Sequence, residues 1–251
     1  MIEEKFVSGQ SFIHKLDPRT RIIAVTILSF AAALCNSIYT ALSYLLISIV
    51  LTGLAKLNAK DVVNRLKPAF WFIAMIWILL PVTFDGEAIY IFYGLKITSS
   101  GILMCCEITI KSISILLFFT SLIATMNVTA LGNALHRLYV PDKMIFLLLM
   151  SYRYIAVIED EYKRLLRAAK FRGFRPKTNI HSYKTFAYLA GMLFVRASLR
   201  AQRVHQAMLC RGFNQKFYSL DVYKANGFNL IFLISVFVMG LSLFILEIIW
   251  I

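Results

Sequence analysis

Five long apolar runs constrain this sequence more than any other feature. They cover residues 22–35, 38–57, 69–84, 102–126 and 228–250. A helix needs about 20 apolar residues, within a range of about 17–25, to cross the hydrocarbon core of a bilayer. The first and third runs are short, so they are tilted, re-entrant or extended by flanking residues. The sequence therefore predicts an all-α, polytopic membrane helical bundle of about five transmembrane helices.

Composition supports a membrane protein and argues against nucleic-acid binding. Apolar residues make up 59% of the 251 residues, above the roughly 45–50% that is typical of soluble domains. The net charge of +14 has two explanations, nucleic-acid binding or basic cytoplasmic loops of a membrane protein. Given the apolar runs, we favour basic loops and expect no nucleic-acid partner.

The distribution of Lys and Arg predicts how the chain crosses the membrane. Basic residues precede the first run and separate the second from the third, whereas the loop 85–100 carries Lys96 against Asp85 and Glu87. The positive-inside rule then places the N-terminus in the cytoplasm. Four crossings return the chain to the cytoplasm near Asn127. We therefore expect a membrane bundle over residues 1–127, a cytoplasmic region over 128–226 and a last transmembrane helix over 227–251.

Two opposite charges lie inside the fourth apolar run. Glu107 and Lys111 are one helical turn apart, in the order that favours an i,i+4 ion pair. Either charge alone would cost about 2.5–3.5 kcal/mol at the membrane centre. An intramembrane charge often marks a transport path, but a mutually neutralising pair explains both residues. We favour the structural pair.

The sequence carries no constellation for catalysis, metal binding or a cofactor. It lacks the GxxxxGK[ST] phosphate-binding motif, and also HExxH and GxSxG. Its four cysteines and four histidines are scattered without ligand spacing. We therefore predict a protein that is not an enzyme and has neither catalytic nor metal-binding residues, and we regard an intramembrane enzyme as the weaker alternative.

Two long helices are predicted in the cytoplasmic region. The first helix is predicted over residues 142–173, because it follows Pro141 and contains no Gly or Pro until Gly173. Within them the apolar stretch 144–158 is interrupted by Arg153, which indicates burial in protein or a position at the membrane interface. The second helix covers residues 182–211. Its first half, 186–195, is apolar on all sides and predicts burial against other helices, whereas its second half carries several arginines.

A short motif is repeated at the ends of these two helices. The sequence reads AAKFRGF at 168–174 and AMLCRGF at 207–213. Arg in a last turn, Gly in the left-handed position and a following Phe are typical of a Schellman helix ending. Helix capping explains the motif once. Because it occurs at the ends of two cationic helices, we favour a pair of docking sites, and both explanations can hold together.

The same residues resemble a known family. SYRY at 151–154, GMLFVRASLRAQRVHQAMLCRGF at 191–213 and HKLDPRTR at 14–21 are similar to the transmembrane coupling (T) subunit of energy-coupling factor (ECF) transporters. The sequence of residues 191–213 is most similar to the cobalt/nickel (CbiQ-type) branch. The resemblance implies a non-catalytic, multi-pass subunit of the prokaryotic cytoplasmic membrane, which transmits ATP-driven motion during uptake of cobalt or nickel.

The resemblance also implies partners and site residues. Two Ala-Arg-Gly tripeptides of the family insert into two cytoplasmic P-loop ATPase subunits, and Phe171 and Cys210 stand here where the family usually has Ala. The expected ATPase-coupling residues are Arg172, Gly173, Phe174, Arg211, Gly212 and Phe213, with support from Arg164 and Arg203. An integral membrane substrate-binding subunit is expected to pack near Phe186, Leu189, Leu193 and Phe194. A membrane scaffold and a self-sufficient permease without an ATPase partner are the alternatives.

Overall fold

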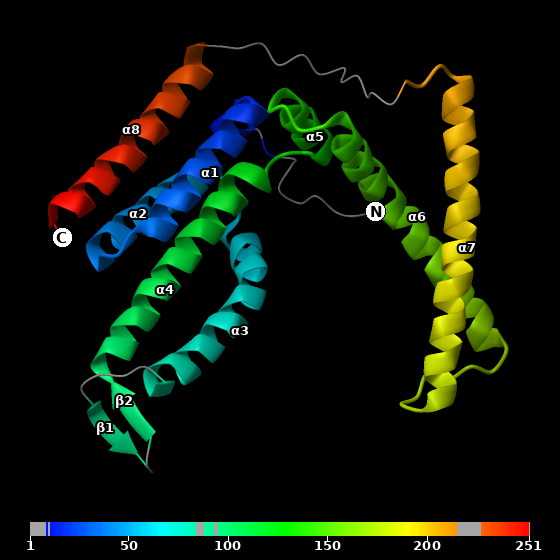
Figure 1. Cartoon of the computed structure of the whole chain (residues 1–251), viewed down its shortest axis with the longest axis horizontal. Coiled ribbons are helices and arrows are strands. Elements are labelled where there is room, and N and C mark those ends of the chain that lie inside the picture. Colours follow the sequence, from blue (N-terminus) through cyan, green and yellow to red (C-terminus); the bar gives the residue numbers. More distant parts are fainter. Residues whose placement is uncertain (1–8, 10, 84–87, 93–94, 215–226, 251) are drawn as a thin grey trace. The chain divides into compact units, whose positions relative to one another are not determined.

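The computed structural model describes residues 9, 11–83, 88–92, 95–214 and 227–250 (Figure 1). Its elements, in chain order, are the 3₁₀ turn η1 (Phe12–Lys15), α1 (Pro18–Leu34), α2 (Ile38–Leu54), α3 (Ala59–Thr83), β1 (Ala88–Phe92), β2 (Leu95–Thr98), α4 (Ser99–Phe118), the π-helical segment η2 (Phe119–Ile123), α5 (Val128–Arg137), α6 (Asp142–Phe171), α7 (Ile180–Cys210) and α8 (Gly227–Trp250). The predicted helical membrane fold is confirmed. One addition is the antiparallel hairpin of β1 and β2, which lies where the sequence indicated only a loop.

The helices form two compact units. One contains α1 to α4 and α8, and the other contains α6 and α7. The boundary between them falls inside α5, between Ala134 and Leu135. We call the first the membrane unit and the second the long-helix hairpin.

The membrane unit is organised around α1 and α4. Helix α1 packs against α8 and α4, and α4 also packs against α2 and α3. Its core is apolar and includes Val25, Leu28, Tyr44, Phe118 and Leu122. Helix α3 and the continuous helix Ser99–Ile123 are long and apolar enough to cross a membrane, and Ile38–Leu54 and Gly227–Leu243 are shorter apolar helices.

The short first and third apolar runs are extended by flanking residues. Helix α3 begins at Ala59, ten residues before the run, and helix α1 begins at Pro18, where the Asp17 side chain accepts a hydrogen bond from the Arg19 amide. An N-cap followed by Pro is a favourable helix start. Side chains on the outside of α3 are strongly exposed, including Trp71 at 82%. An aromatic surface of this kind suits contact with lipid.

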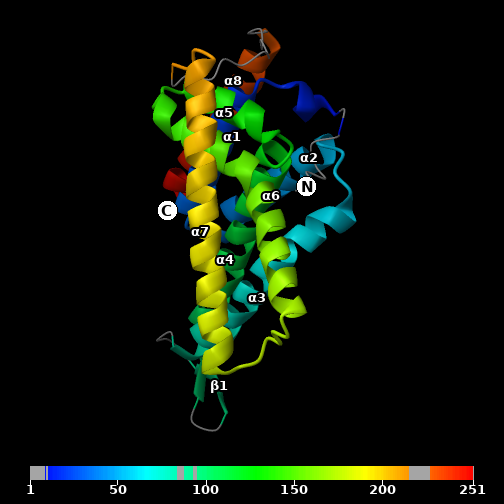
Figure 2. The same ribbon diagram turned by 90° about the vertical axis from the view of Figure 1, so that its right-hand side faces the viewer.

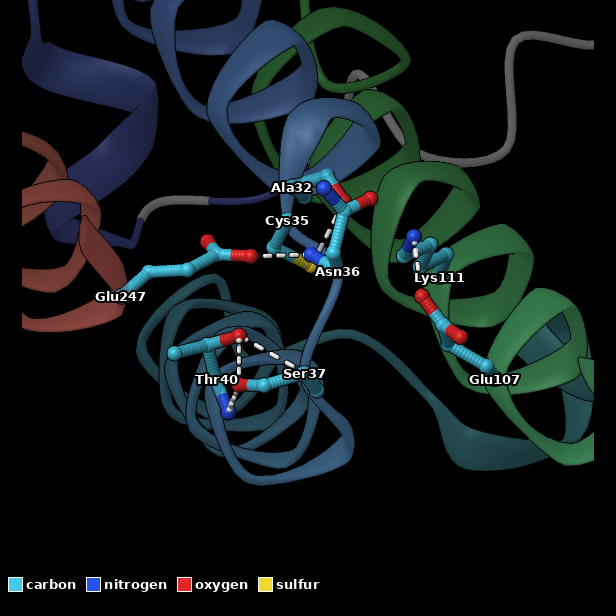
Figure 3. Close-up of polar contacts among 8 residues, drawn as sticks. All are labelled: Ala32, Cys35, Asn36, Ser37, Thr40, Glu107, Lys111 and Glu247. Atoms are coloured by element: carbon cyan, nitrogen blue, oxygen red, sulfur yellow. Dashed lines mark hydrogen bonds and ion pairs between the residues drawn. The ribbon is translucent and has the colours of Figure 1, made fainter. Parts of the chain in front are cut away.

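Polar contacts attach α8 to the α1–α2 pair. The Asp17 amide donates to Asn229 Oδ1 at 3.4 Å, and the Tyr44 hydroxyl donates to the Gly240 carbonyl at 3.4 Å. At the other end of α8 the buried Glu247 accepts a hydrogen bond from the Asn36 amide in the α1–α2 turn (Figure 3). Glu247 was not among the predicted residues, because nothing in the sequence relates α8 to that turn.

The intramembrane ion pair forms as predicted. Lys111 Nζ lies 2.5 Å from Glu107 Oε1 within α4, and both side chains are largely covered (Figure 3). A neutralised pair lowers the cost of placing charge in the bilayer. The geometry fits the structural reading of these two residues.

Candidate partner-docking site

Helices α6 and α7 form an antiparallel hairpin. They cross in Figure 1 and lie beside one another in the turned view of Figure 2. Helix α6 runs for 30 residues without Gly or Pro, and α7 is capped by Asn179, whose side chain accepts a hydrogen bond from the Ser182 amide at 3.2 Å. A helix of about 30 residues is roughly 45 Å long. The hairpin therefore holds its two helix C-termini far apart, at opposite ends.

A charged contact fixes the crossing point. Glu161 on α6 accepts a hydrogen bond from Arg196 on α7, and Arg200 Nη2 lies 3.9 Å from the same carboxylate. Only 14% of the Glu161 side chain is exposed. The hydrogen bond from Arg196 lowers the pKa of Glu161, partial desolvation opposes the shift, and nearby arginine charges add to it. Glu161 is therefore held as a carboxylate between two cations.

Both helices of the hairpin end in the same hydrogen-bonded motif. After α6, the Gly173 amide donates to the Lys170 carbonyl at 3.0 Å and the Phe174 amide donates to the Ala169 carbonyl at 3.1 Å. After α7, the Gly212 and Phe213 amides bond to the Leu209 and Met208 carbonyls at the same two distances. Gly173 has φ +84° and Gly212 has φ +77°. Both are Schellman endings with glycine in the left-handed position, so the capping role predicted for the repeat is present at both ends.

The phenylalanine of each motif points into the hairpin. Phe174, at the end of α6, meets Phe186 of α7 with ring centroids 5.5 Å apart and the rings nearly perpendicular. Phe213, at the end of α7, meets Phe146 of α6 at 5.4 Å. Each ring thus fastens a helix end to the start of the other helix. Phe174 and Phe213 are internal supports of the two ends, whereas the Arg and Gly of each motif are exposed.

We name the two exposed termini by their residues. The first end is residues 170–175 and the second end is residues 209–214. Arg172 and Arg211 are the C-cap residues that directly follow the last residues of their helices, and both are exposed. Arg164 and Arg203 are also exposed, each eight residues before the Arg of its end, which is about 12 Å along the helix and 80° around it. The four predicted arginines thus form two matched pairs, one near each end.

The four residues predicted to contact a substrate-binding subunit do not share one face. Phe186 packs on Phe174, and Leu189 and Leu193 are half-buried toward α6. Phe194 points outward and is 76% exposed. Within the described chain, residues 186–195 are not buried on all sides as expected, because α6 covers only one side of α7. The uncovered side is an apolar surface that includes Tyr188, Phe194 and Val195.

A cavity lies on each side of the crossing. One, of about 380 Å³, lies between Phe146, Met150 and Tyr154 of α6 and Ala201, Val204 and Met208 of α7. The other, of about 540 Å³, lies beside the first end, between Leu165 and Ala168 of α6 and Leu189 and Met192 of α7. The helices therefore touch at their crossing and their ends, with space between.

The crossing residues escaped the sequence analysis, although a signal was present. One face of α6 carries residues at spacings of three or four, namely Phe146, Met150, Tyr154, Val157 and Glu161.

Over the described residues, no group of three or more His, Cys, Asp or Glu side chains is placed to hold a metal ion.

These features define a helical membrane protein with an antiparallel pair of long helices that presents two matched, capped termini. Comparison with known proteins names the family. The CbiQ family model, described as cobalt transport protein, matches residues 9–223, which include both ends of the hairpin. The chain belongs to this family and is a T component of an energy-coupling factor transporter.

Three similar proteins share one name. The energy-coupling factor transporter transmembrane protein EcfT of Leuconostoc gelidum subsp. gasicomitatum is 31% identical, over 83% of this chain and 82% of its own length. The protein of the same name from Macrococcus caseolyticus is 30% identical over 94% of this chain and 95% of its own length. That from Bacillus subtilis is 25% identical over 85% and 84%. The similarity extends over the membrane unit as well as the long-helix hairpin.

Proposed function

We propose that this chain couples two cytoplasmic P-loop ATPase subunits to an integral membrane substrate-binding subunit and performs no catalysis itself. The observation that carries the proposal is the pair of matched Arg-Gly ends, exposed at the two extremes of one hairpin. Each end offers an exposed guanidinium, which suits acidic acceptors in a partner groove. Two such ends fit two partners, and the hairpin keeps a constant span between them.

The proposed coupling uses the hairpin as a lever. A movement of either end is transmitted along a helix to the crossing, where Glu161 connects α6 to Arg196 and Arg200 of α7. Ring pairs at both ends resist fraying, so the helices move as rigid rods. The membrane unit then receives the motion through α5, which continues from one unit into the other.

The exposed apolar side of α7 is the proposed contact for the substrate-binding subunit. Phe194 and Tyr188 are each 76% exposed, and an apolar patch of this kind suits a partner surface. Phe186, Leu189 and Leu193 support it from beneath. The proposed orientation is multi-pass in the prokaryotic cytoplasmic membrane with the N-terminus in the cytoplasm, since basic residues gather in segments that would share that side.

Cobalt or nickel is the proposed cargo, held by the other membrane subunit. Support comes from the resemblance of residues 191–213 to the cobalt/nickel branch and from the description of the matched family as cobalt transport protein. Uptake of radioactive cobalt and nickel by cells with and without this gene tests the cargo. Equal uptake in both would remove the metals from the proposal and leave the coupling role untouched.

Affinity purification tests the coupling role. The wild-type chain is expected to bring down P-loop ATPase subunits from membranes, and Arg172→Ala with Arg211→Ala to lose them. Truncating one partner of a buried charged contact weakens binding by about 2–5 kcal/mol. Lys177→Ala and Lys184→Ala are the matched controls, since exposed cations contribute less than about 1 kcal/mol. If neither the wild type nor the variant recovers an ATPase, a scaffold or a self-sufficient permease replaces this proposal.

A further inference from the structure

We infer that the two ends of the hairpin bind chemically different grooves, and that Phe171 is the residue by which the first end recognises its partner. The inference rests on the proposed function, because it concerns how the ATPase partners are held. It goes further in naming the chemistry of each groove.

The exposed side chain of Phe171 is not needed to stabilise the end of α6. Its side chain is 92% exposed, at the last helical position before Arg172. The hydrophobic contact of the Schellman ending is made by Phe174, which packs on Phe186. One phenylalanine of the first end therefore faces inward and stabilises the cap, whereas the other projects into solvent beside the exposed arginine.

An isolated exposed apolar residue is ordinary on a protein surface. Phe171 differs from such residues because it directly precedes Arg172. Any groove that receives Arg172 must also receive the side chain that precedes it on the same helical turn. Aromatic rings and arginines are the side chains that most often anchor protein interfaces, and the first end presents one of each side by side.

The second end has the same backbone but different side chains. Cys210 takes the place of Phe171, Leu209 that of Lys170, and Asn214 that of Arg175. The exposed apolar side chain of the second end is thus Leu209, one residue earlier and about 100° around the helix from the position that Phe171 occupies. A pocket shaped for one apolar side chain would miss the other.

Charge distinguishes the ends as well. The first end carries Lys170, Arg172 and Arg175, whereas Arg211 is the one cation of the second end. All four side chains are exposed. The groove that fits the first end therefore combines a deep apolar pocket with an acidic rim. The groove that fits the second end is less acidic and has a shallower apolar site for Leu209.

The experiment isolates one end at a time in the full-length chain. The chain is reconstituted in lipid nanodiscs, and the ATPase subunits that co-purify with the wild type are titrated onto it to measure Kd. An Arg211→Ala background leaves the first end intact, and an Arg172→Ala background leaves the second. We expect Phe171→Ala to raise Kd about tenfold to a hundredfold in the first background and to leave it unchanged in the second. Phe171→Leu should recover most of the loss.

Tyr139 provides the matched control. It is 97% exposed and aromatic, but it lies in the turn between α5 and α6, outside both ends. Tyr139→Ala should leave Kd unchanged in both backgrounds. As an independent measurement, a photo-crosslinking phenylalanine analogue at position 171 should attach to an ATPase subunit at residues lining an apolar pocket, whereas the analogue at position 139 should not.

The possible outcomes distinguish failure of the coupling proposal from failure of the Phe171 inference. If Arg172→Ala and Arg211→Ala both leave Kd unchanged, the coupling proposal fails and this inference fails with it. If the arginine variants weaken binding but Phe171→Ala changes Kd less than twofold in the Arg211→Ala background, only the inference is overturned. Equal weakening by Phe171→Ala in both backgrounds would also overturn it, because the effect would then not belong to the first end.

Discussion

Glu161 of α6 accepts a hydrogen bond from Arg196 of α7 at the point where the two helices cross. Arg200 lies one helical turn further along α7, within 3.9 Å of the same carboxylate. The acidic side chain is thus shared by two cations on successive turns of the facing helix. This arrangement fixes both the position of the crossing along each helix and the sides on which the helices meet.

Removing Glu161 should loosen the crossing. Glu161→Ala leaves Arg196 and Arg200, one turn apart on α7, without a counter-charge, so amide hydrogen exchange in α6 and α7 should accelerate near the crossing. Glu161→Gln retains a hydrogen-bond acceptor and should have a smaller effect. Glu159→Ala is the control, because Glu159 pairs with Lys163 on its own helix and both side chains are half exposed. An equal effect of both alanine variants would contradict a role for the crossing contact.

The Glu161 contact should also make hairpin stability depend on pH. The hydrogen bond from Arg196 lowers the pKa of Glu161 relative to the unfolded chain, where a Glu titrates near 4.5. A lowered pKa means that the folded state binds the proton less well than the unfolded state. The stabilisation is therefore full above the unfolded pKa and is lost as pH falls through the lower, folded value. Thermal unfolding of wild type and Glu161→Gln, followed by circular dichroism, should differ at pH 7 and converge as pH falls below the lowered pKa of the folded state.

Replacing glycine by alanine should lower the stability of the hairpin at two positions and raise it at a third. Gly173 and Gly212 have positive φ, so Gly173→Ala and Gly212→Ala should each destabilise the hairpin by about 1 kcal/mol, although an added Cβ meets nothing within 4 Å. Gly191 lies in the middle of α7 with similar open space around it. Gly191→Ala should therefore stabilise by about 0.5–1 kcal/mol. Denaturant unfolding measures all three, and destabilisation by Gly191→Ala would indicate a close contact at that position.

The aromatic pairs should couple the ends of the helices. Phe174→Ala removes a half-buried ring and should cost about 1–3 kcal/mol of stability. A double-mutant cycle with Phe186→Ala should give a coupling energy of about 0.5–1.5 kcal/mol, as expected for an edge-to-face pair. Phe174 paired with Phe146→Ala serves as the reference cycle, because Phe146 contacts the other end. Equal coupling in both cycles would contradict the pairing.

The charges of α4 should behave as a unit. Lys111→Met alone leaves Glu107 without its partner inside the membrane, and should reduce folded yield and thermal stability in detergent. The double variant Glu107→Gln with Lys111→Met removes both charges and should restore most of that stability. Strictly additive losses, measured by the melting temperature of the purified chain, would mean that the two side chains act independently.

Local patterns determined most of what could be predicted. The apolar runs located the membrane helices, and the absence of Gly and Pro between Asp142 and Gly173 located α6 almost to its end. The repeated motif identified both Schellman endings, since Arg, Gly and Phe act there on neighbouring residues. Each of these signals is contained within a few helical turns.

Contacts between distant segments were the part that could not be predicted. The pairing of Glu161 with Arg196 depends on how α6 and α7 cross, and that of Glu247 with the Asn36 amide depends on where α8 packs. The inward direction of Phe174 and Phe213 likewise follows from the partner helix. Phe174 and Phe213 were predicted as parts of Schellman endings and as docking residues, but their ring partners on the other helix were not predicted, because one helix considered alone does not show which side its neighbour covers.

The hairpin has a further property that follows from its antiparallel course. Phe146 meets Phe213, Phe174 meets Phe186, and Glu161 meets Arg196 between them. A half-turn about an axis through the crossing therefore approximately exchanges α6 with α7 and each capped end with the other. A single polypeptide obtains in this way an approximate version of the two-fold symmetry of a homodimer without a second copy. Residues 171 and 210 break that symmetry, so two equivalent backbone endings carry a different side chain at the same position.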